Sequence, residues 1–373
     1  MFDRDAAPPV LGRVGATLVA LGALWGCEPD PSVALADEGC EIIRNPVTVL
    51  GDHGEERSVR QPPRAVLPVE DGFLVFEGTP VLLHYDGQGR YVGEWADAGQ
   101  GPGELSIPMS VATDPLDTVW VAEMGGRISL FGPDGGFGRL MTEGWPAYPQ
   151  LQTFTAAGDP ILWRLPREGA RLEVLTRSGS PMLTFDFPEP DTAGLSSISL
   201  LEPGGVVPEG QESGGPERVY TRTLRGDALL DMRLEEDGSA AADTLATVAD
   251  MVTAFTDAGT DLHPDSVSGI SQIARGPDGT IWGTAFHRIA DHHDVNPIPE
   301  DMTEAPAATL AMRNEIWDVL LWAFDDESRS FTVTPPLEES VVGFVDGSRH
   351  YTLHEDSLGL LMIQIWEHEH QCG

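Results

Sequence analysis

Residues 99–135 read GQGPGELSIPMSVATDPLDTVWVAEMGGRISLFGPDG, and this stretch decides the fold. It contains three short β-rich runs, at 110–117, 118–123 and 127–135, which are separated by Asp and Gly turns. Short apolar runs in alternation, broken by Gly, Asp or Pro, are typical of antiparallel hairpins. A fourth run, FGRLM at 137–141, completes one antiparallel sheet.

The same plan recurs on both sides of this stretch. One unit spans 65–95 and another spans 151–187, and each again contains strand, turn, strand, glycine turn and strand. The closing glycines Gly89, Gly135 and Gly179 recur about every 45 residues, which is the length of a four-stranded propeller blade.

Three later units are less regular, and sustained helical periodicity is scarce. The fourth opens at 198–205, the fifth at 272–286, and the sixth, 341–366, has only three strands before the chain ends. Residues 41–50, EIIRNPVTVL, precede the first unit and supply the missing outer strand, because ring closure removes exposed sheet edges. The sequence predicts an all-β fold: a six-bladed β-propeller at 41–373, closed by an N-terminal strand in the last blade.

The first 26 residues are predicted to be a signal peptide. Arg4 and Arg13 precede an apolar run at 14–25. That run is too short for a membrane-spanning helix, which needs about 20 residues. The protein is therefore expected to be exported, with a body that lies outside the bilayer.

The apolar run ends in Leu24-Trp25-Gly26-Cys27, which resembles the bacterial lipobox. The resemblance implies that Cys27 receives a diacylglycerol thioether and begins the mature chain, with residues 27–40 as a tether to the membrane. Ordinary secretory cleavage and an uncleaved anchor are the alternatives. Glu28, which follows the cysteine, implies the outer membrane of a bacterial cell envelope.

Cys40 and Cys372 are the two remaining cysteines. In the predicted ring they lie at the ends of two paired strands, and an exported protein meets an oxidising compartment. A disulfide that fastens the last blade is expected. The alternative is two free or metal-bound cysteines.

The 99–135 stretch resembles the NHL-type propeller repeat of six-bladed bacterial lipoproteins. The GQGPGEL loop and Pro108 lead into a strand, VWVAE follows, and RISLF ends in a glycine turn. Glu123 stands where the repeat usually has Asp. The resemblance implies the fold and says little about activity.

The strongly acidic composition argues against nucleic acid as a partner. Acidic residues outnumber basic ones by 60 to 22, which gives a formal net charge of -38. Phosphate backbones and anionic lipid surfaces should be repelled, so nucleic acid is not an expected partner.

Any ligand or partner is expected on the propeller face that carries the outer-to-inner links and the second hairpin loops. A protein, peptide or glycan is the expected partner. The loops assigned to this face include 99–104, 123–127, 166–171, 208–218 and the insertion from 287 to about 314. The candidate binding residues are Gln100, Glu104, Glu123, Arg127, Arg167 and Arg171.

The insertion also suggests a divalent metal as a cofactor. Its ligand types suit zinc or a similar ion, although Asp and His are equally ordinary loop residues. The candidate ligands are His287, Asp291, His292, His293 and Asp294. A second pair, His368 and His370, is expected in a solvated tail.

No catalytic set emerges from the sequence, which lacks a GxSxG nucleophile turn. The leading hypothesis is a non-enzymatic binding or scaffold module. The alternative is a metal-dependent propeller hydrolase or lyase of the gluconolactonase type, with channel carboxylates such as Glu104, Asp114, Glu123 and Asp278. Trp120, Trp163 and Trp282 are expected to pack blades rather than to form a carbohydrate platform.

Overall fold

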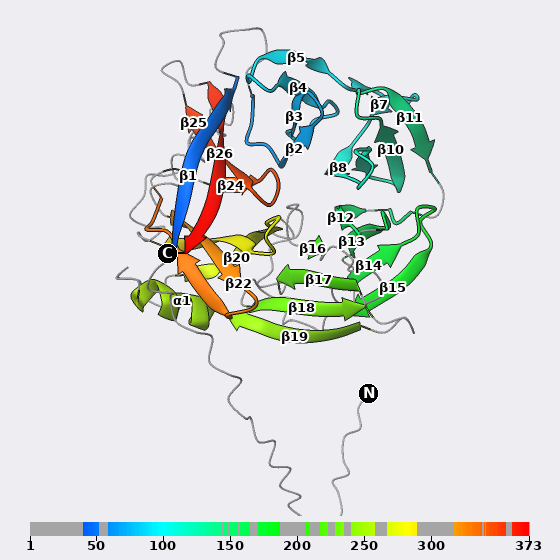
Figure 1. The fold of residues 1–373 in the computed structure, drawn as a ribbon. Helices are drawn as coiled ribbons and strands as arrows, with labels where there is room; N and C mark the ends of the chain where they lie inside the picture. Colours follow the sequence, from blue (N-terminus) through cyan, green and yellow to red (C-terminus); the bar gives the residue numbers. More distant parts are fainter. Residues whose placement is uncertain are drawn as a thin grey trace, which may run out of the picture. The chain divides into compact units, whose positions relative to one another are not determined.

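The computed structural model places most of the chain's strands in six four-stranded antiparallel sheets, set around a common centre (Figure 1). It describes residues 40–372 except for 52–58, 143–144, 148, 156, 165–170, 187–205, 209–216, 223–227, 235–239, 258–266, 289–316, 338, 340 and 356–359.

Each sheet is one blade. Blade 1 contains β2 (Ala65–Val69), β3 (Gly72–Phe76), β4 (Leu83–Asp86) and β5 (Tyr91–Glu94). Blade 2 contains β8 (Pro108–Thr113), β9 (Val119–Glu123), β10 (Arg127–Phe131) and β11 (Phe137–Met141). Blade 3 contains β12 (Gln150–Phe154), β13 (Pro160–Arg164), β14 (Arg171–Leu175) and β15 (Pro181–Asp186).

The later blades follow the same order. Blade 4 contains β16 (Val206–Pro208), β17 (Glu217–Arg222), β18 (Ala228–Leu234) and β19 (Ala240–Thr247). Blade 5 contains β20 (Val267–Arg275), β21 (Ile281–Arg288), β22 (Trp317–Asp325) and β23 (Ser330–Val333). Blade 6 contains β24 (Val341–Phe344), β25 (Arg349–Glu355), β26 (Leu361–Cys372) and β1 (Cys40–Leu50). A short parallel pair, β6 (Asp97–Ala98) and β7 (Glu104–Leu105), lies between blades 1 and 2 in the chain.

The first strand of each sheet faces the centre, and these strands form a ring. β2 contacts β8, β8 contacts β12, and the succession continues through β16, β20 and β24 back to β2. The fold is therefore a six-bladed β-propeller, as predicted. The predicted strands of blades 1 to 3 are confirmed, as are the openings of blades 5 and 6.

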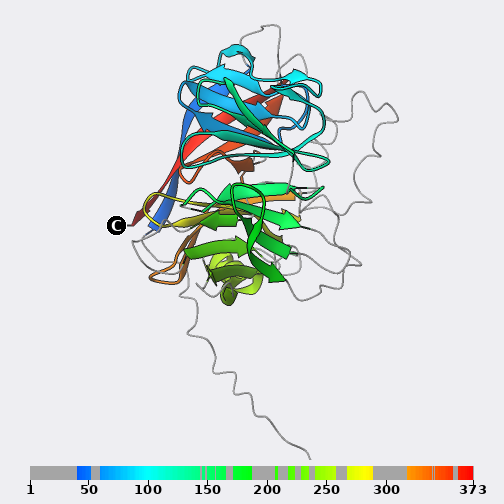
Figure 2. The ribbon, with the colours of Figure 1, turned by 90° about the vertical axis from the view of Figure 1, so that its right-hand side faces the viewer.

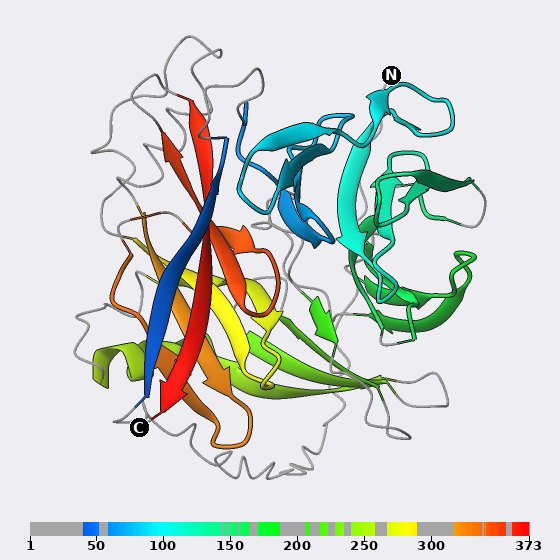
Figure 3. The same ribbon diagram turned by 45° about the horizontal axis from the view of Figure 1, so that its top comes forward.

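Blade 6 closes the ring with both ends of the folded domain. β1 lies antiparallel beside β26 along its whole length, from the pair Cys40–Cys372 to the pair Leu50–Ile363, as Figure 3 shows in blue and red. The register shifts between Pro46 and Thr48. A proline is tolerated there because β1 is the outermost strand and its outer edge pairs with no other strand of the blade. The predicted disulfide joins Cys40 to Cys372 at a sequence separation of 332.

The core lies between blades, because each sheet buries both faces against its neighbours. Leu74 and Phe76 of blade 1, for example, pack with Val111 and Val121 of blade 2, and each is at most 1% exposed. Burying a side chain of this size contributes about 1.5–3 kcal/mol. Because both faces of each sheet are buried, the middle strands of the blades have continuous apolar sequences.

An aspartate turn fixes the first hairpin of blade 2. Asp114 Oδ1 accepts hydrogen bonds from the backbone N–H groups of Leu116 (2.9 Å) and Thr118 (3.0 Å). Its Oδ2 accepts from Trp120 Nε1 at 3.1 Å. The TDPLDTVW sequence is thus a turn whose aspartate also anchors a buried tryptophan.

One helix, α1 (Val248–Asp257), connects blade 4 to blade 5, and the sequence analysis did not predict it. It packs against β19, β20 and β23, and Figure 2 shows it beside the blade 4 strands. Met251 and Phe255, both 0% exposed, join the core of blades 4 and 5. Among the described residues, no helix is long and apolar enough to span a membrane.

The prediction that the segment 208–218 lies on the face with the second hairpin loops is wrong. This segment joins β16 to β17, the first two strands of blade 4, so it leaves the blade at the opposite end. The predicted opening of blade 4 at 198–205 lies outside the described residues, and the first described strand of that blade is β16.

Candidate functional site

A cavity of about 220 Å³ lies in the central channel. The innermost strands of five blades line it, namely β2, β8, β12, β20 and β24. Its polar and charged wall residues are Arg64, Gln152, Thr153, Gln272, Arg275, Asp346 and Tyr351. No sequence motif marks this wall, because its members come from strands that are far apart in the chain.

Gly343 on β24 has no side chain, and this leaves space for two of the wall side chains, Gln272 and Tyr351. A β-carbon at Gly343 would lie 2.7 Å from Gln272 Oε1 and 2.8 Å from the Tyr351 hydroxyl. Gln272 Nε2 donates a hydrogen bond to the carbonyl of Val342 at 2.9 Å. This bond fixes the amide and leaves its oxygen facing Gly343, beside the phenol. The cavity wall therefore presents a positioned amide and a positioned phenol.

The one carboxylate among the cavity-lining residues, Asp346, is compensated locally. Ser348 donates from its backbone N–H (2.9 Å) and its hydroxyl (3.0 Å), and Arg349 Nε donates at 2.9 Å. Burial pushes the pKa of Asp346 up, but the bonds from Arg349 and Ser348 outweigh it and lower that pKa below its usual value. Asp346 is thus ionised and paired at neutral pH, so it adds little net charge to the cavity.

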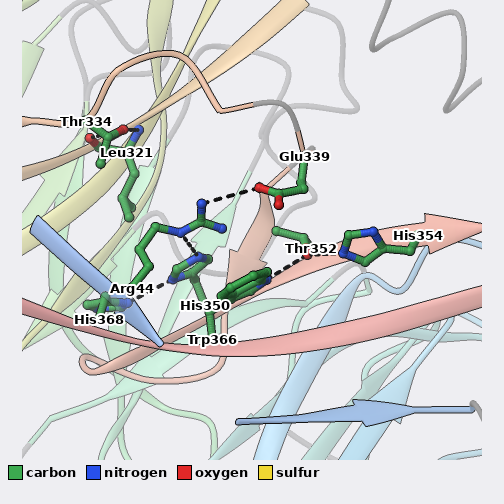
Figure 4. Close-up of polar contacts among 9 residues, drawn as sticks. All are labelled: Arg44, Leu321, Thr334, Glu339, His350, Thr352, His354, Trp366 and His368. Atoms are coloured by element: carbon green, nitrogen blue, oxygen red, sulfur yellow. Dashed lines mark hydrogen bonds and ion pairs between the residues drawn. The ribbon is translucent and has the colours of Figure 1, made fainter. Parts of the chain in front are cut away.

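A chain of hydrogen bonds crosses blade 6 behind this wall (Figure 4). Arg44 on β1 pairs with Glu339 at 3.3 Å and donates from Nε to His350 Nε2 at 3.1 Å. The Nδ1 atoms of His350 and His368 lie 3.0 Å apart. His368 Nε2 reaches the carbonyl of Gly347, a residue of the cavity wall, at 3.3 Å. The chain therefore links the outermost strand to the channel.

The donors in this chain fix the tautomers of both histidines. An arginine Nε only donates, so His350 Nε2 accepts, and the proton of the neutral ring sits on Nδ1. His368 Nδ1 must then accept, and its Nε2–H donates to Gly347. Burial lowers the pKa of His350 well below 6.5, and the nearby charges of His368 and Arg44 lower it further. Burial also lowers the pKa of His368, to about 4.

The expectation of a solvated tail at His368 and His370 is wrong for His368. That side chain is only 3% exposed, and its ring lies 4.2 Å from the ring of Trp282, centroid to centroid. Buried residues alternate with less buried ones from Leu361 to Trp366 on β26, but His368 falls on the other side of this alternation and is buried nonetheless. Strand alternation therefore gives no sequence signal for the burial of His368.

Four of the six predicted binding residues lie together, and they hold a loop. Arg127 donates to the carbonyls of Gln100 at 2.7 Å and Glu104 at 2.6 Å. Its Nε lies 2.9 Å from Glu123 Oε1. Glu123 is fully buried and accepts from the backbone N–H of Ser106 at 2.7 Å. These polar groups are used to hold the 99–104 loop against the β9–β10 hairpin.

The other predicted site residues are scattered or lie outside the described part of the chain. Arg171 is 3.8 Å from Glu173, and Arg167 is not among the described residues. Of the proposed metal ligands, only His287 is described, 3.8 Å from Asp318 Oδ2. The others, Asp291, His292, His293 and Asp294, lie outside the described residues.

The carboxylates that were proposed to line the channel lie elsewhere in the structure. Glu104, Asp114, Glu123 and Asp278 are all described, and none lines the cavity. Asp114 and Asp278 cap turns, the latter by accepting from Thr280. The expected packing role of the tryptophans is confirmed. The exposed fractions are 2% for Trp120, 3% for Trp163 and 2% for Trp282.

Comparisons with known proteins give only distant likenesses. No protein-family profile and no curated protein matches the chain. A Bacteroides fragilis protein described as exported shares 9% identity over 90% of this chain and 97% of its own, with a TM-score of 0.49. A DUF4221 family member from Bacteroides vulgatus shares 10% identity over 89% of this chain and 99% of its own, with a TM-score of 0.46.

A third similar structure is virginiamycin B lyase from Staphylococcus aureus. It shares 11% identity over 87% of this chain and 99% of its own, with a TM-score of 0.45. Likenesses at this level say nothing of the present chain's activity or location.

Proposed function

We propose that this protein is a non-enzymatic binding module that takes the end group of a glycan or peptide into its central channel. The observation that carries the proposal is the cavity of about 220 Å³ with Gln272 and Tyr351 positioned beside Gly343. Amides and phenols both donate and accept hydrogen bonds, which suits hydroxyl and amide groups of a ligand. The cavity is small, so the remainder of a larger partner would stay outside it.

The character of the wall favours binding over metal-dependent catalysis. Among the residues that line the cavity, Asp346 is the one carboxylate, and no histidine or cysteine accompanies it. A catalytic zinc site uses three protein ligands of these types. The hydrolase or lyase hypothesis would therefore need metal ligands from outside this cavity wall.

A pair of variants tests the binding site. Gly343→Ala should push Gln272 and Tyr351 out of position, whereas Gly93→Ala on β5 is the control, since a β-carbon there meets nothing within 4 Å. The probes are glucose, galactose, N-acetylglucosamine, galacturonate and alanyl-alanine, followed by calorimetry. At least one probe should bind the wild type and Gly93→Ala, and its affinity for Gly343→Ala should fall at least tenfold.

Three outcomes would contradict the proposal. Equal affinity in both variants would place binding outside the cavity, and no binding by any of the five probes would remove the end-group model. Conversion of a bound probe, detected by mass spectrometry with Zn²⁺ or Mg²⁺ present, would favour the enzyme. Circular dichroism checks that Gly343→Ala is folded, and Gln152→Leu in the same wall is the second variant.

We also propose that the protein is an NHL-type propeller lipoprotein of a bacterial cell envelope. In this proposal residues 1–26 are the signal peptide, 27–40 the lipid-anchored tether and 41–373 the propeller. The Cys40–Cys372 disulfide supports export, because such bonds persist in oxidising compartments. The lipobox at Cys27 supports the anchor, and Glu28 supports the outer membrane.

Expression of the full chain in a diderm bacterium tests the anchor. The wild type should partition into the membrane fraction with the mass of a chain that begins at a lipid-modified Cys27. Cys27→Ala should leave the membrane fraction or keep its first 26 residues. Unchanged mass and partitioning in Cys27→Ala would refute lipidation.

A further inference from the structure

We propose that reduction of the Cys40–Cys372 disulfide creates a zinc site made of the two thiolates and the imidazole of His370. Among the described residues, these form the one group of three or more His, Cys, Asp or Glu whose potential ligand atoms lie close enough to hold a metal ion. None of the three lines the channel cavity. The proposed site is thus separate from the ligand site.

The strand register brings the three ligands together. Cys40 and Cys372 are directly opposite each other on β1 and β26. His370 is two residues before Cys372 on the same strand, and residues two apart on a strand point to the same face. The Sγ of Cys372 lies 3.7 Å from His370 Nε2, and all three ligand atoms lie within 4.8 Å of one another.

These separations suit zinc. With Zn–S bonds of about 2.3 Å and Zn–N bonds of about 2.0–2.1 Å, tetrahedral ligand atoms stand roughly 3.5–3.8 Å apart. After reduction the two sulfurs, about 2 Å apart in the disulfide, must separate by a little under 2 Å, which rotation about χ1 of the two cysteines can supply, whereas His370 Nε2 already lies at the required distance from Cys372 Sγ. Two thiolates and one imidazole are also the soft ligands that Zn²⁺ prefers over Mg²⁺ or Ca²⁺.

The surroundings give a metal ion access to the site, and one existing hydrogen bond must be given up when it binds. Cys372 is exposed, and Cys40 and His370 are partly exposed, so a metal ion has an entry path. His370 Nε2 lies 2.8 Å from the Thr332 hydroxyl in the disulfide form. Zinc would take the place of this hydrogen bond. A water molecule would occupy the fourth position.

The chemistry balances with a dithiol as reductant. The dithiol gives up two electrons and two protons, becomes a cyclic disulfide, and leaves Cys40 and Cys372 as thiols. Zn²⁺ then binds both sulfurs with release of two protons. The metal replaces the covalent link, so β1 stays fastened to β26 in reducing surroundings.

The test uses the full chain with Cys27→Ala, which leaves only two thiols. After reduction and removal of the reductant, Co²⁺ should give a thiolate charge-transfer band. Zn²⁺ should displace it at one ion per chain. The oxidised chain should show neither. His370→Ala should weaken zinc binding at least tenfold, whereas His354→Ala, on the neighbouring strand β25, should not change it.

If His370→Ala bound zinc as tightly as the parent chain, only the two thiolates would be ligands, and the three-ligand proposal would be overturned. Failure of the folded, reduced chain to bind one ion would overturn it as well. Circular dichroism of the oxidised variants checks folding. His370→Asn and Cys372→Ser provide second variants, and both should lose the tight binding.

Discussion

Glu123 shows how one buried carboxylate can resemble a binding residue in the sequence. It is 0% exposed, pairs with Arg127 at 2.9 Å, and also accepts from the hydroxyl of Ser129 at 3.0 Å. Its carboxylate also accepts from the backbone N–H of Ser106 on the incoming loop. Its contacts give it a role in organising the blade.

Glu123→Ala should lower the free energy of unfolding by about 3 kcal/mol, because Arg127 is left without its buried partner. Asp243→Asn is the control, since its partner Arg233 is 46% exposed and the carboxylate 64% exposed. That change should cost less than about 1 kcal/mol. Urea unfolding of both variants measures the difference, and similar losses would contradict a structural role for Glu123.

The buried histidine pair makes stability depend on pH. In the unfolded chain His350 takes up a proton near pH 6.5, whereas burial keeps it neutral in the fold because its pKa is lowered. The unfolded state therefore binds more protons below that pH. This group should cost up to about 1.4 kcal/mol per pH unit as pH falls below 6.5, and nothing above about pH 7.5.

His350→Gln should flatten this slope between pH 7.5 and 5, measured by urea unfolding at each pH. The net charge of -38 acts in the opposite direction, because protonation of carboxylates relieves their repulsion. The comparison of variant with wild type removes this shared effect. His354→Gln on the same strand is the control, and an equal slope in His350→Gln and wild type would show that His350 does not contribute.

At the scale of elements, α1 is one that sequence analysis missed, although its start carries a signal. Thr247 Oγ1 lies 3.3 Å from the backbone N–H of Asp250, and Asp250 Oδ2 accepts from the backbone N–H of Thr247 at 2.7 Å. This reciprocal pair is a capping box. Val248, Met251, Val252 and Phe255 also follow the helical i, i+3, i+4, i+7 spacing, so the apolar pattern of this segment was a second signal for the helix.

Thr247→Ala should therefore destabilise the protein by about 1 kcal/mol through the lost cap. Thr253→Ala is the matched control, because that exposed hydroxyl only donates to the Ala249 carbonyl inside the helix. It should be neutral or slightly stabilising. Thermal melts distinguish the two, and an equal shift in both would mean that the cap contributes nothing.

On the scale of the whole molecule, the ring and its closure were predictable, whereas the site was not. The blade repeat can be read from local sequence, because successive hairpins carry the same Gly and Asp turns at similar spacing. The pairing of 41–50 with the last strand followed from counting strands. The cavity wall and the contact of His350 with His368 depend on strand register and on five blades meeting, and no local pattern encodes either.

Removal of the disulfide should test how much the closure contributes. Cys40→Ser with Cys372→Ser frees a loop with a sequence separation of 332, and the loop-entropy model gives a loss of about 6 kcal/mol. Denaturant unfolding with intact-mass confirmation measures it, and a loss below about 1 kcal/mol would mean that strand pairing alone holds the ring.

The pairing of β1 with β26 also dictates an order of events during biosynthesis. β1 is synthesised before the strands of blades 1 to 5 and its partner β26 after them, so β1 must wait while five complete blades can already form. During this interval it presents unpaired backbone groups, the kind of edge on which chains associate wrongly. A chain interrupted anywhere before residue 361 would leave β1 without its partner strand. The exposed edge of β1 is therefore paired, and protected from aggregation, only after β26 has been synthesised and exported.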